Sequence, residues 1–383
     1  MKKRSIRSLR RLVPAAVALL MFLPALAAQS TPTEPEMKFG IPVKPGPMDS
    51  VLLKDYKPDV SLVLPRTIVE KARFPVIDAH THSGMSHIRT AADVDAWVRT
   101  MDDVGVEYTV VFTGAIGDEF AQQVKLFAPH RDRFQLWCSL DTENVDDPGY
   151  PRRVAEGVER CYQMGARGIG EITDKGSGIQ EASVPKGERL HIDDPRLDLA
   201  WQACARLKMP VNVHIADHPS AWQPLGPHQE RTPDFQTFNL YGKDVLSYEE
   251  LLARRDRLLL RNPETLFILC HLSNQGNNLA ALSKVLERFP GLHLDLSARD
   301  YEIGRQPRAA AAFLAKYKDR ILFGTDMERD AAMYRGWWQL LETADEFLPG
   351  RILWPYYGLD LPDPVLEALY RKNAKRLLNW TPW

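Results

Sequence analysis

The chain from Phe74 onwards alternates between two kinds of hydrophobic pattern. Short apolar runs rich in β-branched residues are typical of buried strands, and the longer runs between them repeat apolar residues at helical spacing. This alternation predicts eight strands, each followed by a helix. The predicted strands are residues 75–80, 108–114, 133–140, 166–172, 210–215, 266–272, 292–297 and 321–326.

The strand–helix repeat limits the choice of fold. A strand that alternates with a helix gives a parallel sheet covered by helices, and eight repeats suit closure into a barrel. An open doubly wound sheet would show the same alternation, but no G-x-G-x-x-G or G-K-S/T motif follows any of the predicted strands. We therefore predict an α/β fold in which residues 74–383 form a (β/α)8 TIM barrel.

The N-terminal region has a different composition. Residues 1–11 carry six basic residues and no acidic one, an apolar alanine-rich run follows, and residues 25–27 fit a small-residue cleavage site. This order is typical of a secretory signal peptide, which we place at residues 1–27. The apolar run is shorter than the roughly 20 residues that a membrane span needs, so a membrane anchor is the weaker interpretation. Residues 28–73 are rich in proline and are predicted to form an extended leader.

Charge and export signals limit the partners and the location. The net charge of −1 gives no support for nucleic-acid binding. A cleaved signal peptide predicts a periplasmic or secreted protein without a stable membrane span. The expected partner is a small-molecule substrate, and a homo-oligomer is compatible with the sequence.

Polar residues close or interrupt the apolar strands at their C-terminal ends, where the active site of such a barrel lies. In the first strand, Asp78, His80 and His82 alternate with other residues, and residues two apart on a strand face the same way. We therefore expect all three on one face, with Asp78 deeper in the barrel as an orienting residue behind the histidines. The other strand-end residues are Glu171, His214, His271 and Asp326.

This set of side chains indicates a metal site. Imidazole nitrogens and carboxylate oxygens are the usual ligands of catalytic zinc, which keeps one position open for water. Asp326 would offset the charge of the cation and could accept a proton from activated water. A single strand histidine is more often a satisfied core or surface residue, but coincidence does not readily explain so many at separate strand ends. Glu171 is also compatible with a salt-bridged residue at the rim.

Six motifs follow one another over residues 74–378: VIDAHTH, GIGEI, VNVHI, FILCHLSN, SARDYEIGRQP and ILFGTD. In this order they resemble the amidohydrolase superfamily, and within it the amidohydrolase-related branch of metal-dependent barrel hydrolases and decarboxylases. Each motif alone is modest, but the set is specific to the superfamily.

The resemblance implies roles for these residues. His80, His82 and Asp326 would bind a divalent metal, for which zinc is the first choice, and His214 would be a further ligand. Many superfamily members bridge two metals with a carboxylated lysine on the fourth strand, where this chain has Glu171. The site could therefore hold one ion, or two ions bridged by Glu171.

The resemblance and the metal chemistry together predict a hydrolase. A bound metal would polarise a carbonyl and activate water, with Asp326 as the base. His271, which in the superfamily binds a second metal or transfers a proton, would stabilise the developing oxyanion or move the proton. The expected reaction cleaves an amide, ester or lactone bond of a small exogenous substrate. Two alternatives are non-oxidative decarboxylation, which members of this branch perform with the same ligands, and a metal-binding protein without turnover.

Substrate-binding residues are expected in the loops that follow the strands. The longest loop, residues 216–248, follows the metal-bearing fifth strand and holds Trp222, and loops of that length are often functional. Arg299 and Arg305 follow the seventh strand, where an arginine could clamp a substrate carboxylate with two hydrogen bonds. A salt bridge to a neighbouring acidic residue is the alternative for these arginines. The tryptophan pair at 337–338 follows the eighth strand, and one of its rings would suit an aromatic or sugar substrate.

Overall fold

The structure, a computed structural model, describes residues 37–84, 88–179, 189–231, 236–327, 329–350, 353–378 and 380. The predicted signal peptide, residues 1–27, lies outside this part of the chain. The chain divides into two units, Met1–Leu62 and Val63–Trp383. Within the described residues, every helix is too short or too polar to cross a membrane.

The described part of the first unit belongs to the predicted leader. Two strands of two residues each, β1 (Met37–Lys38) and β2 (Ile41–Pro42), pair antiparallel, and two single-turn 3-10 helices follow, η1 (Pro47–Ser50) and η2 (Leu53–Asp55). Side chains are exposed wherever the structure describes them in this unit. Repeated prolines explain the short elements, because proline lacks the backbone donor that a longer helix or strand needs.

The second unit contains the eight predicted strands in the predicted order. They are β3 (Val76–His82), β4 (Val106–Phe112), β5 (Phe134–Trp137), β6 (Ile169–Asp174), β7 (Val211–Ile215), β8 (Phe267–Leu269), β9 (His293–Asp295) and β10 (Ile321–Leu322). Neighbouring strands pair in parallel as one group of three, β3 to β5, and one of five, β6 to β10.

Backbone hydrogen bonds join the two groups of strands at both edges. The Gly170 N–H donates to the Cys138 carbonyl at 3.0 Å, between β5 and β6. The Asp326 N–H donates to the His80 carbonyl at 2.9 Å, between the end of β10 and β3. The strands therefore form a closed (β/α)8 barrel, as predicted.

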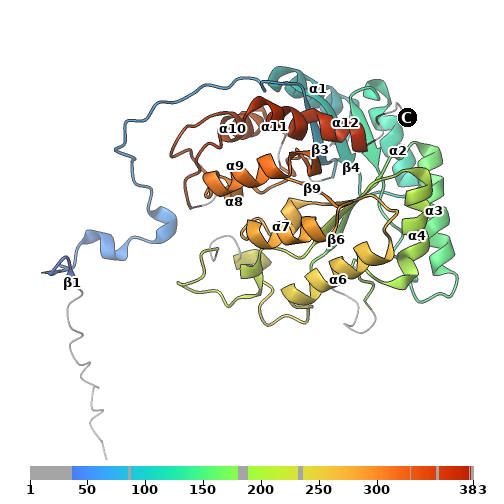
Figure 1. The fold of residues 1–383 in the computed structure, drawn as a ribbon, viewed down its shortest axis with the longest axis horizontal. Helices are drawn as coiled ribbons and strands as arrows, with labels where there is room; N and C mark the ends of the chain where they lie inside the picture. Colours follow the sequence, from blue (N-terminus) through green and yellow to red (C-terminus); the bar gives the residue numbers. More distant parts are fainter. Residues whose placement is uncertain are drawn as a thin grey trace, which may run out of the picture. The chain divides into compact units, whose positions relative to one another are not determined.

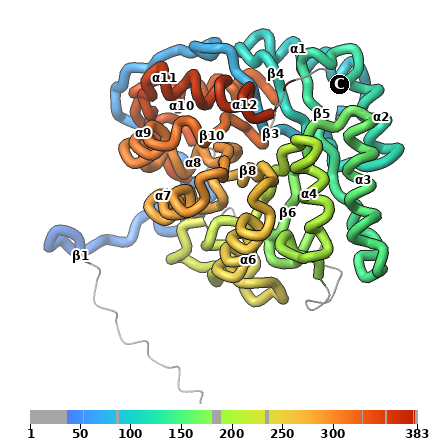
Figure 2. Tube along the Cα trace, turned by 45° about the vertical axis from the view of Figure 1, so that its right-hand side comes forward, coloured from blue at the N-terminus to red at the C-terminus, as the bar shows by residue number. Residues whose placement is uncertain are grey.

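Helices surround the strands of the second unit (Figures 1 and 2). They are α1 (Ala91–Val104), α2 (Gly117–Phe127), α3 (Tyr150–Met164), α4 (Asp198–Leu207), α6 (Tyr248–Arg261), α7 (Leu279–Arg288), α8 (Asp300–Ile303), α9 (Pro307–Lys316), α10 (Ala331–Glu342), α11 (Asp363–Glu367) and α12 (Asn373–Leu377), with the π turn η9 (Ala368–Lys372) between the last two. Short 3-10 turns complete the unit: η3 (Ala128–His130), η5 (Pro195–Leu197), η6 (Pro219–Trp222), η7 (His271–Asn274) and η8 (Lys318–Arg320).

Capping residues explain where the helices begin and end. At the start of α1, the Thr90 hydroxyl accepts from the Asp93 N–H, while the Asp93 carboxylate accepts from the Thr90 N–H. The helix ends before Gly105, whose φ of +94° is a left-handed conformation that glycine adopts without strain. Ser247 and Glu250 form the same reciprocal cap at the start of α6.

A small apolar cluster fills the inside of the barrel. It includes Ile77, Val110, Phe112, Trp137, Ile268 and Leu322 from the strands, with Ala374 and Leu378 from the C-terminal helix region. The Phe112 ring lies 4.7 Å from the His80 ring and 5.4 Å from the His82 ring, measured between centroids. The apolar cluster therefore forms the floor on which the polar strand ends rest.

Candidate active site

The six polar residues predicted at the strand ends come together in one cluster. Their possible ligand atoms form three overlapping groups, and within each group these atoms lie within 4.8 Å of one another. The groups are Glu171, His214, Cys270 and His271; His80, His271 and Asp326; and His80, His82 and Glu171. Cys270 is an addition to the predicted set, and its buried thiol lies 3.1 Å from Glu171 Oε1.

An irregularity in β3 turns His80 and His82 into the barrel. Over residues 78–81, β3 has one more residue than the paired stretch of β4, and such a bulge changes the face that the following residues use. Asp78 therefore faces the outer helices, where the Tyr334 hydroxyl of α10 donates to it at 2.8 Å. The prediction that the three polar residues share one face was wrong, because it assumed uninterrupted alternation.

Asp78 nevertheless supports the cluster from behind. Its carboxylate accepts from the backbone N–H groups of His80 and Thr325, both at 3.1 Å, and from the Thr325 hydroxyl at 2.7 Å. Burial raises the pKa of Asp78 to about 6, against the lowering effect of the bonds from Thr325 and Tyr334. These bonds tie β3 to the segment that carries Asp326, so Asp78 orients neighbours as expected, although from the other face.

Left-handed backbone aims two of the candidate ligands. His271 lies two residues after the end of β8 and Asp326 four residues after the end of β10, with φ of +57° and +51°. This conformation costs about 1–2 kcal/mol in a residue with a side chain, and such residues cluster at functional sites. Gly324 also lets the segment before Asp326 lie close to β3, because a Cβ at position 324 would lie only 2.7 Å from the His80 Cβ.

His80, His82 and Asp326 form the first half of the cluster. Asp326 Oδ1 lies 3.1 Å from His82 Nε2 and 3.5 Å from His80 Nε2. Asp326 Oδ2 lies 3.7 Å from His271 Nε2. The carboxylate of Asp326 thus presents one oxygen to the histidine pair and the other to His271.

Glu171, His214 and His271 form the second half. Glu171 Oε1 lies 2.8 Å from His214 Nδ1 and 2.9 Å from His271 Nε2. The same carboxylate reaches the first half, with Oε1 3.7 Å from His80 Nε2 and Oε2 3.8 Å from His82 Nε2. Glu171 therefore lies between the two halves and not at the rim of the barrel.

The ring nitrogens show that this cluster suits a cation. His80 Nδ1 lies 3.0 Å from Asp295 Oδ2, and His271 Nδ1 lies 2.8 Å from the Ser297 carbonyl oxygen. We assign the proton to each Nδ1 on this basis, which leaves a lone pair on each Nε2 facing carboxylates. The buried Nε2 atoms without a hydrogen-bond partner among the described residues include those of His80 and His82, which face Asp326. Buried acceptors that face one another need a proton or a cation between them, so the residues fit a divalent metal.

Asp295 in β9 is a functional candidate that sequence reasoning missed. One oxygen of this fully buried carboxylate accepts from His80 Nδ1 and from Asn212 Nδ2, each at 3.0 Å. The other oxygen accepts from the backbone N–H of His271 at 3.0 Å. A metal-binding histidine is commonly oriented by a carboxylate that accepts a hydrogen bond from the ring nitrogen that does not bind the metal. An acidic residue inside the apolar run LHLDLS was the signal that could have found it.

The neighbouring histidines keep the two central carboxylates ionised. Burial would raise the pKa of Asp326, but the neighbouring His80 and His82 outweigh burial and hold that pKa well below its usual range. Burial acts on the pKa of Glu171 in the same way, and His214 and His271 outweigh it there. Both carboxylates are therefore charged at neutral pH, as metal ligands must be.

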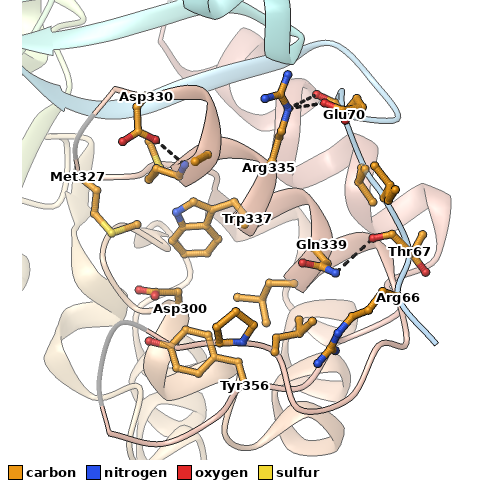
Figure 3. Close-up of a pocket in the computed structure, with 18 of the residues that line it drawn as sticks. Arg66, Thr67, Glu70, Asp300, Met327, Asp330, Arg335, Trp337, Gln339 and Tyr356 are labelled. Atoms are coloured by element: carbon orange, nitrogen blue, oxygen red, sulfur yellow. Dashed lines mark hydrogen bonds and ion pairs between the residues drawn. The ribbon is translucent and has the colours of Figure 1, made fainter. Parts of the chain in front are cut away.

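A cavity of about 1050 Å³ opens beside the first half of the cluster. Figure 3 shows Trp337 and Tyr356 among the side chains that line it. His82 and Asp326 form part of its wall, so two candidate ligands face the cavity. Most of the remaining wall comes from residues 66–70 and from α10 with the segment before it. Trp337 lines the cavity, whereas Trp338 lies in the core, where its Nε1–H donates to the Val104 carbonyl at 3.0 Å.

Arg299, predicted to bind substrate, is buried against the backbone of the cluster. Its guanidinium donates to the carbonyls of His271 at 3.2 Å and Ala298 at 2.9 Å, and to the side chain of Asn274. Glu302 Oε2 lies 3.7 Å from Arg299 Nε. These contacts give Arg299 a structural position that holds the turn from His271 to Asn274.

Arg305 and Trp222 also have partners within the protein. Arg305 bonds Glu230 at 2.8 Å, and the Trp222 indole N–H donates to the Leu246 carbonyl at 2.8 Å. Neither residue, nor Arg299, is among the described residues that line the cavity beside the cluster. A substrate-binding role for these three residues stays a prediction.

A closed parallel barrel with imidazoles and carboxylates gathered at the C-terminal strand ends is the architecture of metal-dependent barrel enzymes. The amidohydrolase family model matches residues 77–380, and the chain belongs to this family of metal-dependent enzymes. No functionally curated protein matches the chain.

Several solved structures are similar to this chain. A candidate amidohydrolase from Staphylococcus aureus is 16% identical with a TM-score of 0.52, and the match covers 80% of this chain and 100% of that chain. A 2,6-dihydroxybenzoate decarboxylase from Rhizobium is 18% identical with a TM-score of 0.47, covering 80% and 99%. A manganese complex of 5-carboxyvanillate decarboxylase from Novosphingobium aromaticivorans is 13% identical with a TM-score of 0.48, covering 82% and 99%. At 16% identity the likeness to the Staphylococcus aureus protein shows the fold alone.

Proposed function

We propose that this protein is a metal-dependent hydrolase that cleaves an amide, ester or lactone bond of a small substrate. The observation that carries the proposal is the convergence of unpartnered imidazole nitrogens and two ionised carboxylates beside a cavity. Such a cluster supports a bound cation with an open position next to the substrate.

His80, His82 and Asp326 would hold the metal, with His214 and Glu171 as further ligands. Histidine nitrogens together with a carboxylate favour zinc, and the same set suits manganese. Glu171 reaches both halves of the cluster, which supports either one ion or two ions bridged by this residue. When bound, the metal supplies a Lewis acid that polarises a carbonyl and lowers the pKa of water to about 7.

Asp326 and His271 would move the protons of the reaction. As water adds to the carbonyl carbon, Asp326 accepts one of its protons at Oδ2, the oxygen that faces His271. His271 Nε2 takes this proton from Asp326 and passes it to the leaving oxygen or nitrogen while the bond between that atom and the carbonyl carbon breaks. The Ser297 carbonyl holds the Nδ1–H of His271, so Nε2 is the atom that exchanges the proton.

The charges on the cavity wall favour hydrolysis of a neutral group over decarboxylation. A decarboxylase binds a carboxylate anion, which an arginine or lysine would recognise beside the metal. Arg66 on the cavity wall donates to the carbonyls of Glu346 at 2.5 Å and Phe347 at 2.9 Å. Arg335 pairs with Glu70 at 2.7 Å. Both arginines among the described lining residues are therefore engaged with protein groups.

The reaction type can be tested on the purified mature chain. Turnover of a panel of esters, lactones and amides in ¹⁸O-labelled water is expected to place ¹⁸O in the acid product, and elemental analysis is expected to find bound zinc or manganese. Release of carbon dioxide from aromatic carboxylates without label incorporation would identify a decarboxylase instead. Metal binding without either reaction would identify a binding protein, and no bound metal after metal-replete expression would contradict the proposal altogether.

We also propose that residues 1–27 direct export to the periplasm or to the outside of the cell. The support is the order of a basic segment, an apolar run and a small-residue cleavage site. Mass spectrometry of the protein from separated cell fractions tests this proposal. An exported chain that begins at Ala28 supports it, and an intact N-terminus in the cytosol contradicts it.

A further inference from the structure

A short segment ahead of the first barrel strand forms one wall of the cavity. Residues 66–70, which we call the strap, line the cavity together with α10 and the segment after β10 (Figure 3). The family match begins at residue 77, so the strap lies outside the part of the chain that the family shares. The strap therefore lies outside the matched part of the chain, contributes to the cavity and leaves the metal cluster to the barrel.

Hydrogen bonds fix the first part of the strap. Thr67 donates its backbone N–H and its hydroxyl to the two oxygens of Asp345, at 2.7 and 2.8 Å. Gln339 on α10 donates to the Thr67 carbonyl at 3.2 Å. Together with the bonds from Arg66 to two loop carbonyls, these contacts hold the strap backbone in one place.

The other end of the strap is tied to the same helix. Arg335 of α10 donates to the Glu70 carbonyl at 3.1 Å and pairs with the Glu70 carboxylate at 2.7 Å (Figure 3). The same guanidinium pairs with Asp103 at 2.9 Å. Val69, between the two anchors, is half-buried and packs against the core. The anchors therefore determine how far the Val69 side chain reaches along the cavity wall.

The cavity surface between these anchors is largely apolar. Its larger apolar lining residues include Ile68, Val69, Met333, Trp337, Leu340 and Tyr356. The arginines beside them are engaged with protein groups, as described above. Apolar walls gain free energy by covering apolar ligand surface, whereas a charged ligand group would lose its hydration without a partner.

We propose that the strap is a specificity wall that selects substrates whose cleaved bond carries an uncharged, apolar body. That a bond is cleaved rests on the proposed hydrolase function. That the bound molecule is apolar rests on the lining of the cavity alone. Val69 is the half-buried apolar residue of the strap and would contact this body, and His82 and Asp326 mark the end of the cavity where the bond is cleaved.

Two substitutions of the same kind isolate the effect of the strap. Val69→Trp fills part of the cavity, whereas Val63→Trp adds the same side chain at a fully exposed position that is not part of the wall. Val69→Ala enlarges the cavity and keeps the test decisive if the tryptophan variant does not fold. Thermal unfolding followed by circular dichroism establishes which variants are folded.

Two readouts separate binding from reaction. Nile red, a neutral apolar dye, reports binding by fluorescence without any chemistry, and 4-nitrophenyl esters from acetate to octanoate report hydrolysis. For the unaltered protein we expect kcat/KM to rise about fourfold per added methylene until the cavity is filled. Val69→Trp should weaken Nile red binding at least tenfold and favour shorter esters, Val69→Ala should favour longer esters, and Val63→Trp should match the unaltered protein.

The outcomes distinguish this inference from the proposed function. Nile red binding that depends on Val69, without hydrolysis of any ester, would support the strap inference and count against the hydrolase. Hydrolysis without a chain-length preference, unchanged in Val69→Trp and Val69→Ala, would overturn the strap inference and leave the hydrolase intact. Absence of both dye binding and hydrolysis would overturn the strap inference and also count against the hydrolase. An effect of Val63→Trp as large as that of Val69→Trp would also overturn the strap inference.

Discussion

On the side of β3 and β10, the candidate metal cluster faces an apolar cavity, whereas on the side of β7, β8 and β9 it faces buried charged residues. We call these the open side and the closed side. On the closed side, Arg299, Glu302 and His218 are 6%, 2% and 7% exposed. On the open side, the arginines of the wall are bonded to the protein and leave apolar surface toward the cavity. Charge close to a site therefore does not by itself mark where a substrate binds.

The closed side shows what buried charge does in this barrel. Arg299 donates to the backbone of the left-handed turn that begins at His271, and Glu302 compensates its charge. His218 Nε2 lies 3.8 Å from Glu302 Oε1 and extends this group of buried polar side chains. The closed side positions the candidate ligands, and the open side selects what reaches them. The predictions below test this division.

The largest expected effect follows from removing the carboxylate that faces both halves of the cluster. Asp326→Asn takes away one negative ligand oxygen and the proposed base, so kcat should fall on the order of 10³-fold or more. Steady-state kinetics on an ester substrate identified by the panel measure this effect, with the exposed and distant Asp319→Asn as the control. Activity of Asp326→Asn within tenfold of the unaltered enzyme would remove Asp326 from the mechanism.

A large effect on stability is expected on the closed side. Arg299→Leu leaves Glu302 buried without its cation, and removal of one partner of a buried pair costs about 3–5 kcal/mol. Urea unfolding followed by fluorescence should show a loss of at least about 3 kcal/mol. Arg335→Leu is the matched variant on the open side, where the arginine is partly exposed, and it should lose much less. Equal losses in the two variants would break the distinction between the sides.

A smaller effect is expected from neutralising Asp295, whose carboxylate accepts hydrogen bonds from both His80 and His271. Asp295→Asn weakens the hydrogen bond that the Nδ1–H of His80 donates to this side chain. Loss of such an orienting partner costs about 10–100-fold in metal affinity. Competition with a chromogenic chelator measures that affinity, and Ser297→Ala, which removes only a hydroxyl next to Asp295, is the milder comparison. Unchanged metal affinity in Asp295→Asn would show that Asp295 does not position the ligand.

Sequence patterns predicted the barrel and its candidate ligands because both depend on local features. Each strand is an apolar run bounded by turn residues, and parallel strands bring their C-terminal ends to one edge, so His80 and Asp326 meet although 246 positions separate them in sequence. The side on which Asp78 lies was not predictable in this way, because the bulge in β3 depends on its pairing with β4. Alternation predicts a face only where the register is regular.

The cavity wall was not predictable for a related reason. The strap has no motif and no charge pattern that distinguishes it from the rest of the predicted leader, and its role depends on long-range bonds such as that of Thr67 to Asp345. The arginines that drew attention in sequence, Arg299 and Arg305, have partners within the protein. Sequence reasoning recognises a charged residue near a site, but only the structure shows whether that charge already has a partner.

The smallest predicted effect concerns pH and the closed side. Burial, with Arg231 and Arg299 nearby, lowers the pKa of His218 to about 4. The unfolded chain binds a proton at His218 below about pH 6.5, whereas the folded protein does not, so folding loses stability as the pH falls from about 6.5 toward 4. At pH 5 this loss should be about 1–2 kcal/mol relative to pH 8.

His218→Gln tests this contribution because glutamine does not titrate. Urea unfolding at pH 8 and pH 5 should show a smaller acid-induced loss in His218→Gln than in the unaltered protein, by about 1–2 kcal/mol. The exposed His228→Gln should follow the unaltered protein at both pH values. An identical acid-induced loss in all three proteins would show that His218 is not held neutral, and the charges of the closed side would then be less shielded from water than their burial implies.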